Sequence, residues 1–154
     1  MLTDLSRRSA LKATGLVAGA SILPALPALA APDTVAVAMD AIKKLTGGKE
    51  PVKGKIKLNL PQIAENGNTV PLGVTVDSPM TVDSHVEEIT VFVTKNPLPI
   101  AIAFLFTPES GKAEASTHIR LAGTQDVIAV AKMSDGTFCI DTKNCKVTIG
   151  GCGG

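Results

Sequence analysis

The sequence predicts an all-β protein, an antiparallel β-sandwich that is preceded by one short helix. Short runs rich in Val, Ile and Thr recur after residue 50, and Gly, Pro, Asn and Asp separate them about every 10 to 15 residues. That spacing is typical of sandwiches, in which each strand is followed by a turn. The chain has four Phe and neither Trp nor Tyr, so Val, Ile, Leu and Ala must build most of the core.

The N-terminus has the pattern of a twin-arginine export signal. Arg7 and Arg8 stand in the run S-R-R-S-A-L-K, and an uncharged, mostly apolar stretch follows over residues 13–29. Ala28 and Ala30 then form an A-x-A cleavage site. This pattern predicts export to the periplasm, and because twin-arginine export usually carries folded proteins, it suggests a partner exported alongside.

The same pattern divides the chain into three parts. We expect a cleaved signal peptide over residues 1–30, one domain over 31–149 and a short arm over 150–154. A transmembrane anchor is the alternative for the first part, but Pro24 and Pro27 interrupt the apolar run. Without the signal, 12 basic and 13 acidic residues remain, a balance that indicates neither nucleic acid nor a membrane surface as a partner.

Local sequence signals predict each helix and strand after the signal peptide. Asp33 is a suitable N-cap for an amphipathic helix over residues 34–45, and Gly47 and Gly48 are suitable for ending it. Strands are expected where apolar residues alternate with polar ones, as in I-K-L-N-L from Ile56. The expected strands cover residues 55–60, 70–76, 86–94, 100–107, 115–122, 127–133 and 145–149.

One of these strands is apolar on both faces. Residues 100–106 read I-A-I-A-F-L-F, as expected of a central strand with its own core on one side and a helix or partner subunit on the other. A strand that is wholly buried within its own domain is the alternative.

The C-terminus places one thiol among glycines. Gly150, Gly151, Gly153 and Gly154 surround Cys152, and glycine visits left-handed backbone conformations as readily as right-handed ones. We expect a flexible arm that presents Cys152 up to roughly 10 Å from the last strand.

Four segments resemble the SoxY family of the periplasmic thiosulfate-oxidising Sox system. They are residues 61–71 (P-Q-I-A-E-N-G-N-T-V-P), 95–99 (K-N-P-L-P), 106–121 and the ending V-T-I-G-G-C-G-G. The resemblance implies an immunoglobulin-like sandwich, a SoxZ-like partner in a heterodimer and a sulfur substrate held covalently on Cys152. Other Sox enzymes would load the substrate, hydrolyse it and oxidise it, so the chain itself would be a carrier and not an enzyme.

No group near Cys152 in the sequence is suited to activating its thiol. Lys146 lies six residues earlier on an expected strand, and the carboxylate of Gly154 disfavours a thiolate. We therefore expect the enzymes that receive the arm to supply the activation.

Cys139 and Cys145 flank the pentapeptide I-D-T-K-N. A turn centred on Thr142 would place them opposite each other in a hairpin and allow a disulfide, since an exported protein permits one. The bond would be a structural staple or, alternatively, a redox pair that exchanges with Cys152. If the two are bonded, Cys152 is left over and is expected to form disulfide-linked dimers.

No metal or cofactor is expected, and two other functions remain open. His85 and His118 have no second histidine at ligand spacing, and the chain has no C-x-x-C pair. The protein could be a structural periplasmic sandwich that crosslinks through Cys152, or a thiol-disulfide oxidoreductase that uses Cys139 and Cys145.

Overall fold

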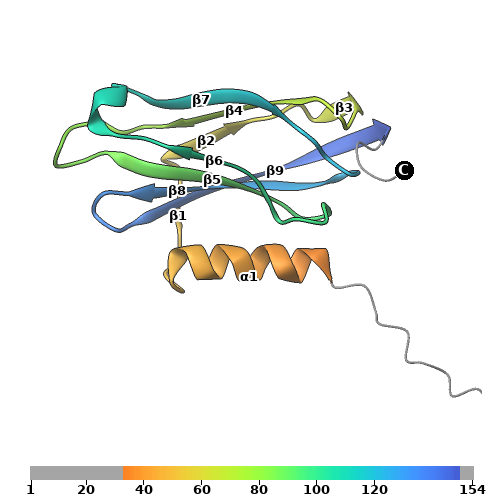
Figure 1. Ribbon diagram of the computed structural model, residues 1–154, viewed down its shortest axis with the longest axis horizontal. Coiled ribbons are helices and arrows are strands. Elements are labelled where there is room, and N and C mark those ends of the chain that lie inside the picture. Colours follow the sequence, from red (N-terminus) through yellow and green to blue (C-terminus); the bar gives the residue numbers. More distant parts are fainter. Residues whose placement is uncertain (1–32, 150–154) are drawn as a thin grey trace, which may run out of the picture. The chain divides into compact units, whose positions relative to one another are not determined.

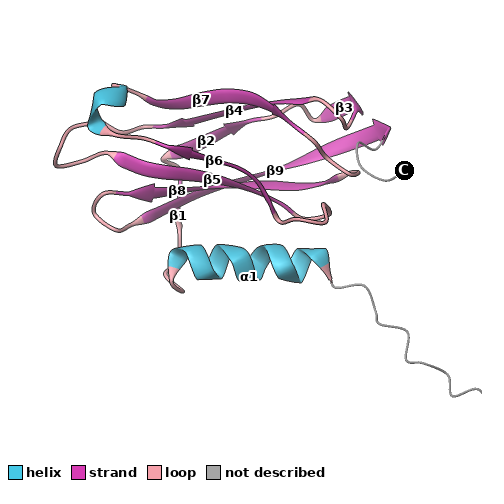
Figure 2. Ribbon diagram, in the orientation of Figure 1, coloured by secondary structure: helices cyan, strands magenta, loops and turns pink. Residues whose placement is uncertain are grey.

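The computed structural model describes residues 33–149, which form a β-sandwich with a helix on one outer face (Figures 1 and 2). One sheet has six strands in the order β1-β9-β8-β5-β6, with β3 also pairing with β9. The other sheet has three strands in the order β2-β4-β7. The predicted sandwich with an N-terminal helix is confirmed.

Helix α1 (Thr34–Thr46) begins and ends at the predicted residues, within one position. The carboxylate of Asp33 accepts a hydrogen bond from the Val35 backbone N–H at 3.0 Å, and Gly47 ends the helix with φ +61°. Ile42 packs against Phe92 and Ile128 on the outer face of the larger sheet. The helix therefore covers part of a sheet face that would otherwise be exposed.

The strands include two that the sequence analysis missed, β1 and β3. A short 3₁₀ turn, η1 (Pro108–Ser110), precedes β7. The strand bounds are β1 Val52–Lys53, β2 Ile56–Asn59, β3 Ile63–Asn66, β4 Val70–Val76, β5 Val86–Val93, β6 Ile100–Leu105, β7 Ala113–Ile119, β8 Gln125–Met133 and β9 Phe138–Ile149.

Strand β9 is the longest strand and has parallel as well as antiparallel neighbours. It pairs antiparallel with β8 along one edge, and on the other edge it pairs in parallel first with β1 and then with β3. Two short strands thus protect the two ends of an edge that would otherwise offer unpaired backbone groups.

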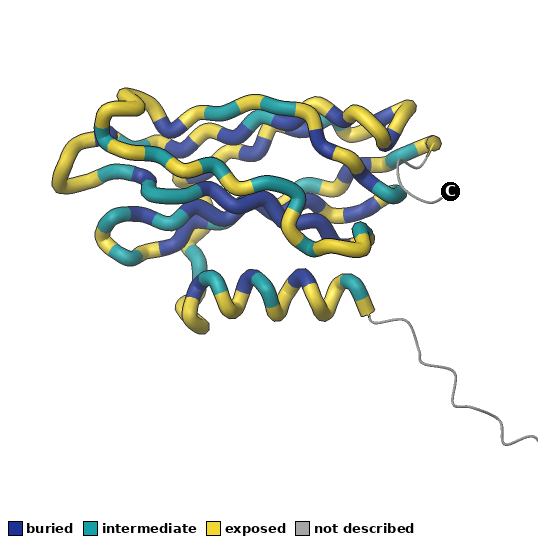
Figure 3. Tube along the Cα trace, viewed as in Figure 1, coloured by how far each residue is buried: buried dark blue, intermediate teal, exposed yellow. Residues whose placement is uncertain are grey.

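The main core lies between the two sheets and consists almost entirely of aliphatic side chains, as predicted. Figure 3 shows buried positions along the strands of both layers. The largest fully buried members are Leu58, Val70, Val74, Val86, Ile89, Val91, Val93, Leu121 and Val127, whereas Phe92 and Val130 belong to the cluster under the helix.

The interpretation of residues 100–106 as a central or wholly buried strand was wrong. Strand β6 is an edge strand that pairs only with β5 within its sheet. Ile102 and Phe104 pack against the core, whereas Ile100 is 50% exposed and Leu105 is 80% exposed. The apolar residues on its other face are therefore open to solvent.

Candidate functional site

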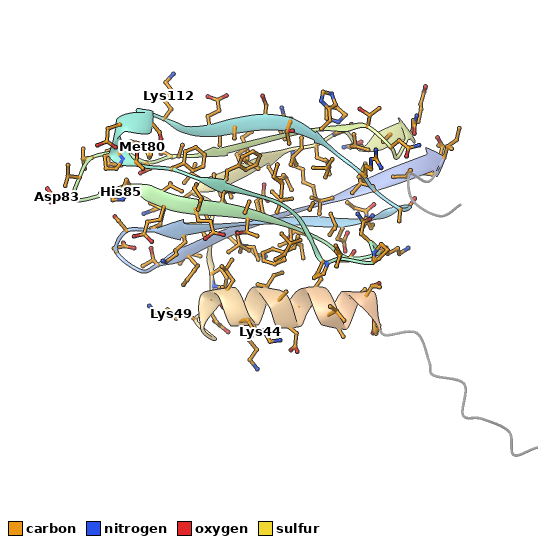
Figure 4. All side chains as sticks on the ribbon, in the orientation of Figure 1. Lys44, Lys49, Met80, Asp83, His85 and Lys112 are labelled. Carbon is orange, nitrogen blue, oxygen red and sulfur yellow. The ribbon has the colours of Figure 1, made fainter. Side chains whose placement is uncertain are left out.

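The predicted arm, Gly150, Gly151, Cys152, Gly153 and Gly154, lies outside the described residues. The described part of the site is the end of β9, which leads directly into these residues. Its arrowhead lies at the end of the sandwich opposite the loop that carries Asp83 (Figures 1 and 4).

Strand β3 holds the end of β9 along one edge. Ala64 and Asn66 are in parallel register with Val147 and Ile149. The backbone N–H of Gly67 donates a hydrogen bond to the Ile149 carbonyl at 2.7 Å, so pairing continues to the last described residue. Residues 61–68, part of a segment that resembles a known family, thus supply the strand that holds the end of β9.

Hydroxyl groups strengthen this anchor. Thr148 Oγ1 donates to the Glu65 carbonyl at 2.8 Å. On the other side of β9, Thr124 Oγ1 accepts a hydrogen bond from the Val147 N–H at 3.0 Å and lies 3.4 Å from the Val147 carbonyl. The end of β9 is therefore hydrogen-bonded on both of its edges, which fixes the point at which the arm starts.

The loop over residues 94–99 is fixed by a second set of hydrogen bonds. The amide of Asn96 bridges the chain after β7, because its Nδ2 donates to the Arg120 carbonyl at 2.8 Å and its Oδ1 accepts from the Ala122 N–H at 2.9 Å. Gln125 is 2% exposed, and it accepts from the Lys95 N–H at 2.7 Å and donates to Asn96 Oδ1 at 2.9 Å.

Backbone hydrogen bonds join the set of contacts at the end of β9 to the set that holds loop 94–99. The Leu121 N–H donates to the Gly67 carbonyl at 2.8 Å, and Gly67 in turn bonds Ile149. Loop 94–99, segment 120–124, turn 67–69 and Ile149 therefore belong to one hydrogen-bonded end of the molecule, called the arm end below.

A groove of about 430 Å³ opens at the arm end, between the edge strands β6 and β7 of the two sheets. Leu98, Ile100 and Ile102 line one side, and His118, Ile119 and Arg120 line the other. Its floor is apolar, and its rim carries exposed basic or titratable side chains.

Cys139 and Cys145 do not form the predicted hairpin. Both lie on β9 and face the core, with Cys139 opposite Ala131 and Cys145 opposite Gln125 on β8. The turn is at Asp135 and Gly136, not at Thr142.

This placement corrects the proposed disulfide. The Cα atoms of Cys139 and Cys145 are six residues apart along the strand, or roughly 20 Å. The Cα atoms of two cysteines joined by a disulfide lie less than about 7 Å apart. Both cysteines are free thiols, so neither the staple nor the redox pair is present.

Burial also makes these two thiols poor nucleophiles. Loss of solvation raises the pKa of Cys139, and it raises the pKa of Cys145 against a smaller opposing effect of a backbone hydrogen bond from Ala64. Since the thiolate is the reactive form, neither residue is suited to receiving a substrate in the folded protein.

The two histidines are far apart in the fold. His85 precedes β5 and its Nδ1 lies 3.1 Å from the Thr81 carbonyl, while His118 is exposed on β7. Within residues 33–149, no three His, Cys, Asp or Glu side chains come together in a way that could hold a metal ion. No helix in that range has the length and apolar character needed to span a bilayer.

The sequence analysis missed Gly67, Asn96, Thr124 and Gln125 as contributors to the site. Their importance comes from contacts with residues 23 to 82 positions away, which no local pattern reveals. The only available signal was that Gly67 and Asn96 lie in segments that resemble a known family.

Comparisons with known proteins agree with this geometry. A family model described as "Sulfur oxidation protein SoxY" matches residues 42–152. Among solved structures, the sulfur carrier protein SoxY from Chlorobium limicola f thiosulfatophilum superposes with a TM-score of 0.59 at 28% sequence identity. That match covers 74% of this chain and 99% of the other. No curated protein sequence matches the chain.

More distant structures share the fold alone. A superoxide reductase (neelaredoxin) from Ignicoccus hospitalis has a TM-score of 0.55 at 14% identity, over 61% of this chain and 80% of that one. A superoxide reductase described as putative, from Thermotoga maritima, has a TM-score of 0.53 at 18% identity, over 64% and 87%. The family match includes β3, loop 94–99, β9 and the cysteine at position 152, and it covers well over half of the sequence. The chain therefore belongs to the SoxY family of sulfur oxidation proteins.

Proposed function

We propose that the protein is a covalent carrier of sulfur intermediates, with the thiol of Cys152 as the attachment point. The observation that carries this proposal is that the family match continues through the arm to residue 152. Burial of Cys139 and Cys145 supports it, because these two thiols cannot compete for substrate in the folded chain.

The chemistry requires a thiol that visits several active sites in turn. Thiosulfate and the Cys152 thiolate join through a new S–S bond, and two electrons pass to an electron-accepting partner enzyme. Water then cleaves the terminal sulfonate as sulfate and leaves a persulfide. An electron acceptor then takes electrons from the outer sulfur while water supplies oxygen atoms, which gives a sulfonate. Hydrolysis releases this sulfonate as sulfate and regenerates the thiol.

Attachment to an arm suits this sequence of steps. A tethered intermediate does not diffuse away, and it is presented to each enzyme at a high effective concentration. The anchored end of β9 supports the same role, since a fixed base limits the volume that the cysteine explores.

Activation of the thiol is assigned to the partner enzymes. Lys146 lies on β9 with its side chain exposed, and it is six residues from Cys152 along the chain. A free thiol has a pKa near 8.5, and without a close cation or helix N-terminus it remains mostly protonated at neutral pH.

The setting in which the carrier works follows from the export signal and the family. We propose that residues 1–30 direct it to the periplasm and that a SoxZ-like subunit is its constitutive partner. Dimers linked through Cys152 are expected when the protein is kept in air without substrate.

Intact-mass analysis of the protein from thiosulfate-grown cells, without reductant, tests the proposal. We expect added masses of sulfur, sulfite or thiosulfate, and peptide mapping should confine them to the C-terminal peptide. The Cys152→Ser variant should carry none of these additions.

A double variant, Cys139→Ala with Cys145→Ala, is the matched control because it keeps only Cys152. It should be loaded like the unsubstituted chain. Additions on Cys139 or Cys145, or an unmodified Cys152 during active thiosulfate oxidation, would contradict the proposal.

A further inference from the structure

The arm end carries an exposed apolar side chain that the fold holds in a fixed position. Leu98 is 74% exposed, and it stands between Pro97 and Pro99 in the loop that Asn96 and Gln125 fasten to segment 120–124. Proline restricts the backbone, so the loop loses little conformational entropy when it is bound. An exposed leucine on a rigid loop is well suited to serve as a docking contact.

The length of the arm limits how far from the end of β9 an enzyme that acts on Cys152 can bind. Cys152 is three residues beyond Ile149, so its sulfur lies no more than roughly 10 Å from the end of β9. Two hydrogen-bonded steps, from Ile149 to Gly67 and from Gly67 to Leu121, separate β9 from the segment beside the groove. At about 4.8 Å per step, this segment lies roughly 10 Å from the arm's base.

These two distances are short compared with the width of a typical protein–protein interface. A standard interface buries about 800 Å² per partner, which corresponds to a disc roughly 30 Å across. An enzyme that holds Cys152 in its active site will therefore cover the groove between β6 and β7 as well.

The charges at the arm end indicate the chemistry of that enzyme surface. Lys95, Arg120 and Lys146 are exposed here, against the acidic side chains Glu65 and Asp126. Three basic side chains therefore stand against two acidic ones, and the small excess of positive charge complements a surface with carboxylates.

We propose that Leu98 and the groove beside it, with Arg120 on the rim, form the docking surface for the enzymes that act on Cys152. The partner surface inserts an apolar side chain between β6 and β7 and places carboxylates near Arg120. This inference rests on the proposed carrier function and adds a recognition site to it.

The test compares two leucines at opposite ends of β6. Leu98→Ser removes the proposed contact, and Leu105→Ser is the matched control because Leu105 is 80% exposed and precedes η1 at the far end. Arg120→Ser probes the rim. Each full chain, purified with its SoxZ-like subunit, is incubated with thiosulfate and a periplasmic extract of thiosulfate-grown cells, and loading of the C-terminal peptide is timed by mass spectrometry.

We expect loading to slow about tenfold in Leu98→Ser and several-fold in Arg120→Ser, and to be unchanged in Leu105→Ser. Iodoacetamide should alkylate Cys152 at the same rate in all variants, which separates docking from thiol reactivity. Salt should slow the loading of the unsubstituted chain, because the rim contacts are charged.

Three results would overturn the inference. Loading of Leu98→Ser at the normal rate, or equal slowing in Leu105→Ser, would remove the docking role from this end. Loss of the SoxZ-like subunit from Leu98→Ser would assign the groove to that subunit instead. Absence of loading in the unsubstituted chain, by contrast, would remove the carrier function itself and the inference with it.

Discussion

Burial separates Cys139 and Cys145 from any reagent in solution. Their side chains are 2% and 0% exposed, and they pack in the aliphatic core between the sheets. In such a position a free cysteine behaves as a small apolar residue. At the scale of single residues, we therefore expect Cys152 to carry the thiol chemistry of the folded protein.

Thiol titration tests this division. In the native protein without its signal peptide, a thiol reagent such as Ellman's reagent should react rapidly with one cysteine, and in denaturant with all three. A single reactive thiol in denaturant without reductant would mean that Cys139 and Cys145 are bonded, contrary to their positions on β9.

The raised pKa values of the two buried thiols predict alkaline destabilisation. The folded state keeps both thiol protons to a higher pH than the unfolded state does. Stability is therefore complete below the unfolded thiol pKa of about 8.5 and is lost as the pH rises from there through the higher folded values.

Urea unfolding at pH 7 and at pH 10 measures this effect. The loss of unfolding free energy from pH 7 to pH 10 should be smaller in a Cys139→Val, Cys145→Val double variant than in the unsubstituted protein. An equal loss in the variant would show that other groups account for the alkaline sensitivity.

At the scale of elements, β9 shows what the sequence could not predict. The residues D-T-K-N from Asp141 look like a turn, yet they lie in the middle of a 12-residue strand. Pairing with β8 provides their backbone bonds, and the Asp141 carboxylate accepts the Leu58 N–H of the other sheet at 2.8 Å. These contacts are non-local, and they override the local preference.

Strand β6 shows a related limit. Its residues are apolar on both faces, but composition alone cannot distinguish a central strand from an edge strand with an exposed face. In contrast, α1 was predicted closely because its cap at Asp33 and its stop at Gly47 are local signals.

Loop 94–99 depends on one buried amide. Gln125→Ala would leave the Lys95 N–H without its partner and remove one of the hydrogen bonds that hold Asn96, at an expected cost of about 1–3 kcal/mol of unfolding free energy. Urea denaturation measures this cost. Asn144→Ala, which removes an exposed hydrogen bond to Asp126, is the control and should cost under about 1 kcal/mol. Equal values would show that the buried amide does not hold the loop.

At the scale of the molecule, the sandwich brings together three segments that are distant in sequence. Residues 67, 96 and 121–125 meet at the end where β9 stops, because β5, β7 and β9 all run toward that end. The sequence predicted the fold class and the aliphatic core, and both are confirmed; the role of Cys152 stays a prediction. It could not predict the arm end, since a local pattern carries no information on which loops share one end of a sandwich.

Under the proposed carrier function, the protein would need no catalytic centre of its own. Its described residues fix the end of β9, and we propose that partner enzymes dock beside it and carry out the reactions. The central claim is thus that one thiol at position 152 is indispensable while the other two are not.

Growth on thiosulfate tests this claim most directly. A strain whose only change is Cys152→Ser should fail to oxidise thiosulfate, while a strain with Cys139→Ala and Cys145→Ala should oxidise it whenever the protein accumulates normally. Normal thiosulfate consumption by the Cys152→Ser strain would contradict the account.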